Sequence, residues 1–292
     1  MSIAPWARAA PPDNLVRPQL VSAATAVEPG KPLTIGLHLI VTDGWHIYWT
    51  NPGDAGAATT FKISVPEGFK VEAVQYPVPE KLPQPGGLTI YAYEKELLLT
   101  ATITPPADLR GMTSVPISAL AGWCVCSDVC VLGKQKLDLD IPVAAAGGSK
   151  AQNGELFDAW RARAPASSDQ AFKSIGVSWE TEASGPVSIS SSRTAHLTFA
   201  WRGEAPAKQF EWLPGPSDDL TVTFVSQETS GGNTQLTLKV DPIKGIPPTS
   251  ATIDGILAYH LAGQPPLGVA VTLDRKGSGL AMPDQAASAD AK

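Results

Sequence analysis

The sequence predicts an all-β protein with two immunoglobulin-like β-sandwich domains joined by a short helical linker. Apolar and polar residues alternate in several segments, which is the pattern of strands with one buried face. Turn-forming residues separate these segments, with 26 glycines and 27 prolines among 292 residues. This Gly and Pro content stays below the roughly 25–30% that is typical of disordered low-complexity chains. Only one segment has helical spacing, so the sequence favours strands almost throughout.

The first predicted domain covers residues 13–145. Five apolar residues alternate between Leu33 and Val41, and the same period returns over 97–103 and 137–143. In a strand, such residues share one face. Turn pairs interrupt the pattern, and we expect six to nine short strands. The turn signals are Pro29-Gly30, Asp43-Gly44, Pro66-Glu67-Gly68 and Pro105-Pro106.

A linker with one short helix is predicted over residues 146–169. Small residues at 144–149 end the first domain, and helical spacing follows at about 153–164. Asn153 is a good N-cap residue, and Pro165 ends the segment because proline cannot continue a helix. The apolar residues on one face of this helix are Leu156, Phe157, Trp160 and Ala164.

The second predicted domain covers residues 170–275. Alternation returns at 195–201, 220–224, 236–240 and 267–273, over a length close to the roughly 100 residues of an immunoglobulin-like domain. It contains no cysteine, so we assign the thiol chemistry to the first domain. Trp201 and Trp212 leave carbohydrate binding as an alternative that rests on fold analogy alone.

Charge and the chain ends narrow the function classes. The net charge is −6 without a basic cluster, so we expect no nucleic-acid partner. No apolar run approaches the roughly 18–20 residues of a membrane span. Residues 1–12 are an export-signal remnant or a disordered end, because Ala7 and Ala9 resemble a signal cleavage site without its apolar region. Residues 276–292 are expected to form a flexible tail.

The three cysteines lie close together, at positions 124, 126 and 130. Cys126 and Cys130 can meet across one tight loop. Cys124 and Cys126 would lie nearly 7 Å apart on one face of an extended strand, so they could pair only with strain. The spacing therefore predicts a disulfide between Cys126 and Cys130.

Three functions remain open for this cluster. A bond that closes so short a loop stabilises little, which favours an exchanging disulfide over a purely structural one. Asp128 inside the loop would disfavour a thiolate, so a hyperactive nucleophile is not predicted. Alternatively, three thiolates could hold Cu(I), or zinc with His46 as a fourth ligand. Hydrolase motifs such as G-x-S-x-G do not occur.

Several motifs resemble the N-terminal periplasmic region of the DsbD/ScsB protein-disulfide reductases. They are Gly44-Trp45-His46-Ile47-Tyr48-Trp49-Thr50-Asn51-Pro52-Gly53-Asp54-Ala55-Gly56, Pro66-x-Gly68-Phe69, Tyr76-Pro77-x-Pro79, Tyr91-x-Tyr93 and Trp123-x-x-Cys126-x3-Cys130. The resemblance covers roughly residues 15–145, and the β-rich remainder is compatible with the second immunoglobulin-like unit of the ScsB type.

The resemblance implies an enzyme domain, a protein-disulfide reductase in the periplasm that belongs to a larger inner-membrane protein. Transmembrane and C-terminal thioredoxin-like domains of the full-length protein would deliver electrons, and thioredoxin-fold periplasmic proteins would receive them. Cys126 and Cys130 match the redox pair, with Cys130 forming the mixed disulfide and Cys126 resolving it. No cofactor beyond the disulfide and no small-molecule substrate are implied. Cys124 and Leu132 depart from the family pattern, which usually has proline at the latter position.

Some residues near the pair have two interpretations. The segment Trp45–Gly56 could form a loop that shields the disulfide, as a cap does in relatives. The possible shielding or positioning residues are Trp123, His46, Tyr48, Trp49 and Asp128. The interpretation that we favour is that Trp45, Tyr48 and Trp49 fill the sandwich core and that residues 51–54 form a tight turn. His46 is then a structural hydrogen-bonding residue rather than an acid or base.

Overall fold

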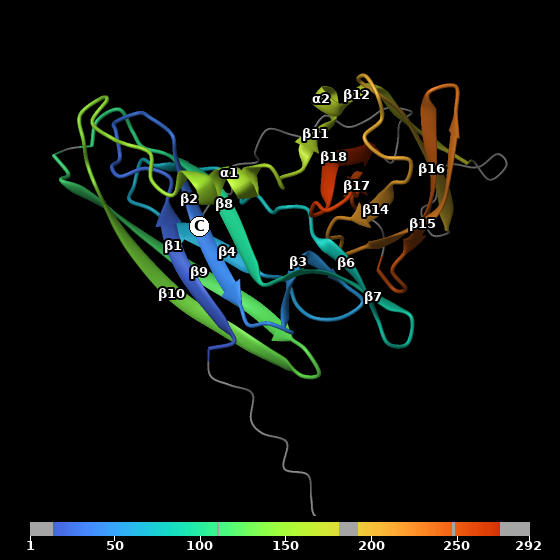
Figure 1. The fold of residues 1–292 in the computed structure, drawn as a ribbon, viewed down its shortest axis with the longest axis horizontal. Helices are drawn as coiled ribbons and strands as arrows, with labels where there is room; N and C mark the ends of the chain where they lie inside the picture. The colour runs from blue at the N-terminus through green and yellow to red at the C-terminus, as the bar shows by residue number, and fades with distance from the viewer. Residues whose placement is uncertain (1–13, 110, 181–191, 247–248, 275–292) are drawn as a thin grey trace, which may run out of the picture.

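The computed structural model describes residues 14–109, 111–180, 192–246 and 249–274 (Figure 1). These residues form four β-sheets and two short helices, which confirms the mainly β prediction. The expectations for residues 1–12 and for the tail at 276–292 lie outside the described residues. No helix in the described part of the chain is both long and apolar enough to span a bilayer.

The first half of the chain forms two antiparallel sheets. One sheet has the order β1-β2-β8-β5, and the other has the order β10-β9-β3-β7-β6 with β4 paired to β9. The prediction of six to nine strands was low by one, because the two-residue strand β5 has no alternating pattern to reveal it. The strands are β1 (Val16–Ser22), β2 (Leu33–Val41), β3 (His46–Gly53), β4 (Thr60–Ser64), β5 (Lys70–Val71), β6 (Glu80–Gln84), β7 (Leu88–Glu94), β8 (Glu96–Thr104), β9 (Ser114–Cys126) and β10 (Cys130–Pro142).

The two sheets enclose one apolar core. The alternating residues of β2, from Leu33 to Val41, are all buried in it, together with residues of β8, β3 and β9. The hairpin of β9 and β10 is the longest in this half, and its register runs without a break from Ser114 opposite Pro142 to Cys126 opposite Cys130. The core holds β9 along its length, up to Val125, and the hairpin register places Cys126 opposite Cys130 at its tip.

Helix α1 (Gly154–Arg161) packs on the outer face of the first sheet (Figure 1). Phe157 and Trp160 are buried there, and Gly36 provides room because a Cβ atom at that position would lie 3.2 Å from the Phe157 ring. Asn153 stands at the predicted N-cap position, but its side chain makes no capping hydrogen bond. Its backbone is left-handed, with φ 54°, and its side chain donates to the Ser22 carbonyl at 3.1 Å instead of capping the helix. Tertiary contact replaced the local cap.

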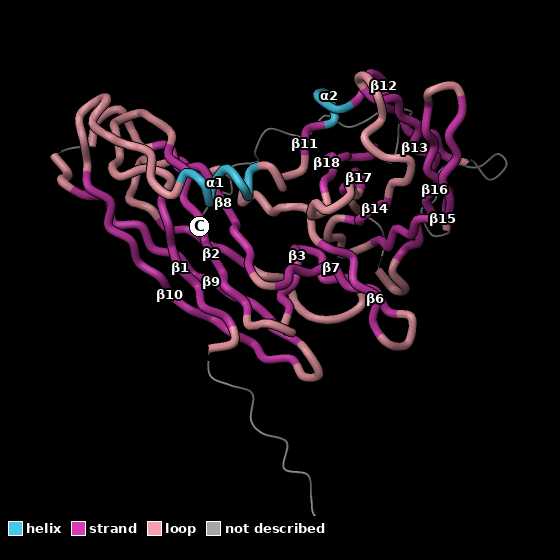
Figure 2. Tube along the Cα trace, viewed as in Figure 1, coloured by secondary structure: helices cyan, strands magenta, loops and turns pink. Residues whose placement is uncertain are grey.

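The second half of the chain forms two further sheets around a second apolar core (Figure 2). Their orders are β11-β18-β17-β14, with β11 parallel to β18, and β12-β13-β16-β15. Trp212 is buried in this core, and Trp201 stacks on Phe210 at its border. The elements are β11 (Ala166–Ser167), α2 (Ser168–Ala171), β12 (Phe172–Trp179), β13 (Arg193–Trp201), β14 (Glu211–Pro214), β15 (Leu220–Ser230), β16 (Asn233–Pro242), β17 (Thr252–Tyr259) and β18 (Leu267–Asp274).

The two halves contact each other through apolar side chains. Leu213 of β14, with Ile256 and Ala258 of β17, belongs to the apolar cluster of the first half. The Lys81 ammonium lies 3.8 Å from the Glu211 carboxylate at the edge of this contact. The second half thus lies beside strands β3, β6 and β7 of the second sheet (Figure 1).

Candidate thiol-disulfide site

A disulfide joins Cys126 and Cys130 at the tip of the β9–β10 hairpin. The two residues are paired in the register, and their Cα atoms lie 4.1 Å apart. Residues 127–129 form the loop between them, in which the Ser127 amide donates to the Val129 carbonyl at 3.0 Å. The predicted disulfide is therefore present, and the hairpin places its two cysteines opposite each other.

The two cysteines of this bond differ in exposure. Cys126 is 2% exposed, whereas Cys130 is an exposed residue at the start of β10. Leu132, two residues after Cys130, is 78% exposed. The disulfide thus joins an exposed residue to a buried one, and an exposed apolar residue follows two positions after Cys130. Cys130 is therefore the more exposed of the two bonded cysteines.

The cysteines lie on the face of their sheet that points away from the main core. Along β9, Cys124 and Cys126 occupy this outer face, whereas Val125 is buried in the main core. Along β3, Tyr48 occupies the outer face beside the cysteines, and Trp49 lies in the main core. The outer-face cluster, which we call the cysteine cluster, consists of Tyr48, Ile90, Ala92, Cys124 and Cys126, with Leu82 at its edge.

These positions divide the residues predicted for shielding or positioning. The structure brings His46 and Tyr48 to the cysteine side, but Trp49 and Trp123 pack against the main core. Trp123 lies over Gly133 across the hairpin, where a Cβ atom would come within 2.2 Å of its ring. The expectation that Tyr48 fills the main core was wrong, because residues 46 and 48 alternate with 47 and 49 and the cysteines occupy the outer face. Trp45 is partly buried against the main core.

A short segment, residues 54–58, lies over the cysteine cluster, and we call it the covering loop. Gly56 sits against the Tyr48 ring with φ +94°, and Ala58 pairs with Tyr48 through an isolated bridge. The backbone of Ala57 hydrogen-bonds Cys124. Tyr48 is consequently 2% exposed, although it lies outside the main core.

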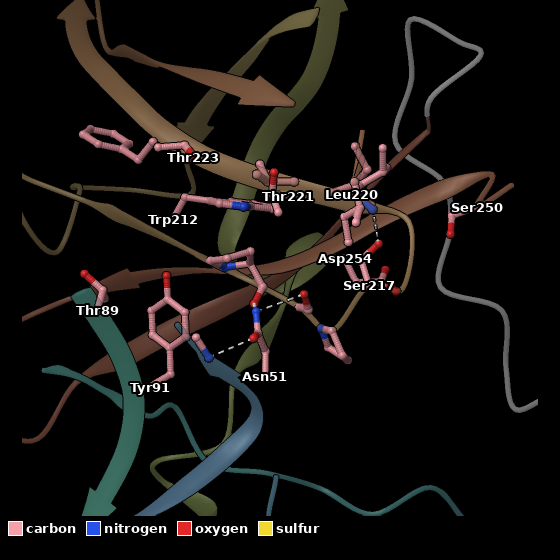
Figure 3. A pocket seen from close by; sticks show the side chains of 18 of the residues that line it. Asn51, Thr89, Tyr91, Trp212, Ser217, Leu220, Thr221, Thr223, Ser250 and Asp254 are labelled. Atoms are coloured by element: carbon pink, nitrogen blue, oxygen red, sulfur yellow. Dashed lines mark hydrogen bonds between the residues drawn. The ribbon is translucent and has the colours of Figure 1, made fainter. Parts of the chain in front are cut away.

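Both halves of the protein contact the turn at residues 51–54, which leads into the covering loop (Figure 3). The Asn51 side chain donates to the Pro214 carbonyl at 2.9 Å and to the Gly215 carbonyl at 3.3 Å, and it accepts from the Gly53 amide at 3.0 Å. Asp54 accepts from the Thr89 amide at 2.7 Å. A cavity of about 700 Å³ opens beside this contact, between the two halves. The Asn-Pro-Gly-Asp turn is visible in the sequence. The carbonyl groups that Asn51 binds are not, because they lie about 160 residues later in the chain.

His46 and Tyr48 form a hydrogen-bonded pair beside the disulfide. His46 Nε2 lies 3.1 Å from the Tyr48 hydroxyl, and the rings meet edge to face. Burial lowers the pKa of His46, with Glu94 opposing this shift, and burial together with Cys124 raises the pKa of Tyr48. A neutral imidazole paired with a phenol fits the predicted structural role of His46.

Cys124 is a buried free thiol next to the disulfide. Its Sγ lies 3.6 Å from Cys126 Sγ, and the three cysteine sulfurs all lie within 4.8 Å of one another. Burial raises the pKa of Cys124, while the Ala57 hydrogen bond opposes this shift. Asp128 is exposed in the hairpin loop and is not a member of this group. In the described ranges, this trio is the one His/Cys/Asp/Glu group with metal-ligand spacing.

Fold and site together define a mainly β protein with a disulfide at the tip of a long hairpin. Residues 13–142 match the family model described as "Thiol:disulfide interchange protein DsbD, N-terminal", so the match covers the first half of the chain. The resemblance seen in the sequence is thereby confirmed. The comparison with curated protein sequences finds no significant match.

One solved structure agrees at the level of the fold. The N-terminal periplasmic domain of ScsB from Proteus mirabilis is similar with a TM-score of 0.62 and 15% identity, over 91% of this chain and 96% of that one. The N-terminal domain of DsbD from Neisseria meningitidis, in its reduced form, matches with a TM-score of 0.28 and 14% identity, over 49% of this chain and 94% of that one. The first likeness extends across both halves of the chain.

Proposed function

We propose that this chain is a periplasmic thiol-disulfide interchange domain that reduces disulfides of thioredoxin-fold proteins. The family match of residues 13–142 supports this function, and the observation that carries it is the unequal exposure of Cys126 and Cys130. A surface sulfur can meet a partner protein, while a buried neighbour waits to complete the exchange.

The chemical steps follow from this arrangement. In the reduced domain, the Cys130 thiolate attacks a partner disulfide, which forms a mixed disulfide and releases one partner thiolate. Cys126 then attacks Cys130 Sγ and releases the second partner thiol. The partner gains two electrons and two protons, and the domain returns to the Cys126–Cys130 disulfide seen here.

Regeneration requires a dithiol donor. We propose that transmembrane and thioredoxin-like domains of a larger DsbD-like protein deliver the electrons, as the family implies. The cycle needs no organic cofactor. The covering loop would restrict access to Cys126 and Cys124, so that small thiols in the periplasm compete poorly with the proper partners.

We also propose how the chain is divided into domains. Each half has two sheets around one apolar core, which supports two immunoglobulin-like sandwiches over residues 13–145 and 170–275 with a linker at 146–169. The redox pair belongs to the first domain. The second domain would support the covering loop through the carbonyl oxygens that bind Asn51.

Trapping tests the proposed roles directly. A catalytic amount of reduced protein should transfer electrons to an oxidised thioredoxin-fold protein, as measured by the appearance of partner thiols. Cys126→Ser should accumulate a mixed disulfide through Cys130, whereas Cys130→Ser should accumulate little. Unchanged partner thiols would show that this disulfide does not exchange with such partners. Equal trapping by the two variants would contradict the assignment of Cys130 as the attacking residue.

A further inference from the structure

We propose that the reduced domain binds one Cu(I) ion through Cys124, Cys126 and Cys130. This inference goes beyond disulfide exchange, which uses two cysteines and leaves Cys124 without a role. The observation behind it is spatial: the Cys124 and Cys126 sulfurs lie 3.6 Å apart, and all three sulfurs lie within 4.8 Å of one another.

The hairpin builds the three-sulfur arrangement. Cys124 and Cys126 are two residues apart on β9 and therefore share one face, and Cys130 of β10 lies opposite Cys126 in the register. Metal–thiolate bonds of about 2.3 Å in a trigonal plane place the sulfurs roughly 4 Å apart. The Cys124–Cys126 separation is already close to this value. Once the disulfide is reduced, only the Cys126 and Cys130 sulfurs must move apart.

The ligand set selects the metal. Thiolates favour soft ions such as Cu(I) and also bind zinc, but structural zinc sites are almost always four-coordinate. In the part of the chain that the structure describes, the group of close metal-binding side chains holds three cysteines and no fourth ligand. His46 Nε2, the fourth ligand considered from the sequence, is instead hydrogen-bonded to the Tyr48 hydroxyl. Three sulfurs in an apolar cluster fit three-coordinate Cu(I).

Metal binding and the disulfide exclude each other. A dithiol reductant must first give two electrons and two protons to the Cys126–Cys130 bond, which makes two thiols and oxidises the reductant to its disulfide. Cu(I) then replaces the protons of the three thiols, and these protons pass to solvent. Because Cys130 is exposed while Cys124 and Cys126 are buried, the ion would enter at Cys130. A domain holding Cu(I) would be withdrawn from disulfide exchange.

Competition for Cu(I) tests the proposal. The full chain is reduced with a phosphine, freed of metal and titrated anaerobically with Cu(I) against bicinchoninate, a coloured Cu(I) chelator. We expect one Cu(I) per chain, ultraviolet thiolate-to-copper absorption, and no competition by the oxidised protein. Cys124→Ser should lower the affinity at least tenfold. Equal affinity of Cys124→Ser and wild type, or binding by the oxidised protein, would overturn the three-cysteine site.

Further measurements separate loss of a copper ligand from loss of folding, and they test the choice of metal. Circular dichroism and Cys124→Ala, which introduces no hydroxyl, separate loss of a ligand from loss of folding. A parallel zinc titration should show weaker retention than Cu(I), and tighter zinc binding would overturn the choice of metal. The reductase assay on Cys124→Ser is independent, because the exchange pair remains. The two assays can therefore give different answers. Copper binding can fail while disulfide exchange succeeds, and disulfide exchange can fail while copper binding succeeds.

Discussion

The Tyr48 ring lies directly against the backbone of Gly56, so closely that a Cβ atom at Gly56 would be 2.2 Å from Tyr48 Cζ. Gly56 also has φ +94°, a conformation that side-chain-bearing residues rarely adopt. This contact seats the covering loop on the cysteine cluster. The covering loop can take this position because residue 56 is a glycine and has no side chain.

Gly56→Ala should displace the covering loop. A loss of about 1.4 kcal/mol in the closed loop raises its open population about tenfold. In the oxidised protein, Cys124 is the one free thiol among the three cysteines, so its alkylation rate measures loop opening. We expect that rate to rise about tenfold. Gly44→Ala is the matched control, since Gly44 has φ +78° and open space around it. Equal rates in the two variants would contradict the role of the ring contact.

Asn51→Ala should also expose Cys124, although the substitution lies at the contact between the two halves. It removes two donated hydrogen bonds to the second half and one accepted from Gly53, each worth about 1 kcal/mol. We expect alkylation of Cys124 to accelerate several-fold. Lys81→Ala breaks only the 3.8 Å ion pair with Glu211 at the same contact, which should contribute no more than about 1 kcal/mol. If Lys81→Ala has as large an effect, general loosening between the halves is responsible.

Cys124→Ala should leave disulfide exchange nearly unchanged. Burial raises the pKa of Cys124, so this residue stays a thiol near neutral pH and is a poor nucleophile. We expect the rate of electron transfer to an oxidised thioredoxin-fold protein to stay within about twofold of wild type. Unfolding should cost about 1 kcal/mol less, because a small buried group is removed. A tenfold loss of transfer would instead make Cys124 part of the exchange.

His46 should make stability depend on pH. Burial holds the pKa of His46 below its ordinary value of 6.5, so the unfolded chain binds a proton where the folded protein does not. The free energy of unfolding should therefore fall as pH decreases through 6.5 toward the folded-state pKa. Urea titrations of wild type and His46→Gln between pH 8 and 5 would isolate this contribution as the difference between the two curves. A difference that is constant over this range would mean that His46 does not contribute.

Much of the fold follows from local pattern. Alternation from Leu33 to Val41 predicted β2, and Phe157 and Trp160 predicted the buried face of α1. Asn153 takes the predicted N-cap position, but its side chain donates to the Ser22 carbonyl, which is distant in sequence, instead of capping the helix. Local signals predict an element well when periodic burial marks it, whereas a side chain's distant hydrogen-bond partner leaves no local signal.

The sequence by itself determined the alternating strands, the resemblance of residues 15–145 and the cysteine pair, because period-two alternation, motif spacing and a four-residue separation are all properties of short segments. Only the tertiary structure decided that Tyr48 faces the cysteines while Trp49 faces the main core, since alternation groups residues by face without saying what covers each face. The covering loop and its anchor at Pro214 likewise depend on segments that meet only after folding, as hydrogen bonds between distant residues leave no local pattern.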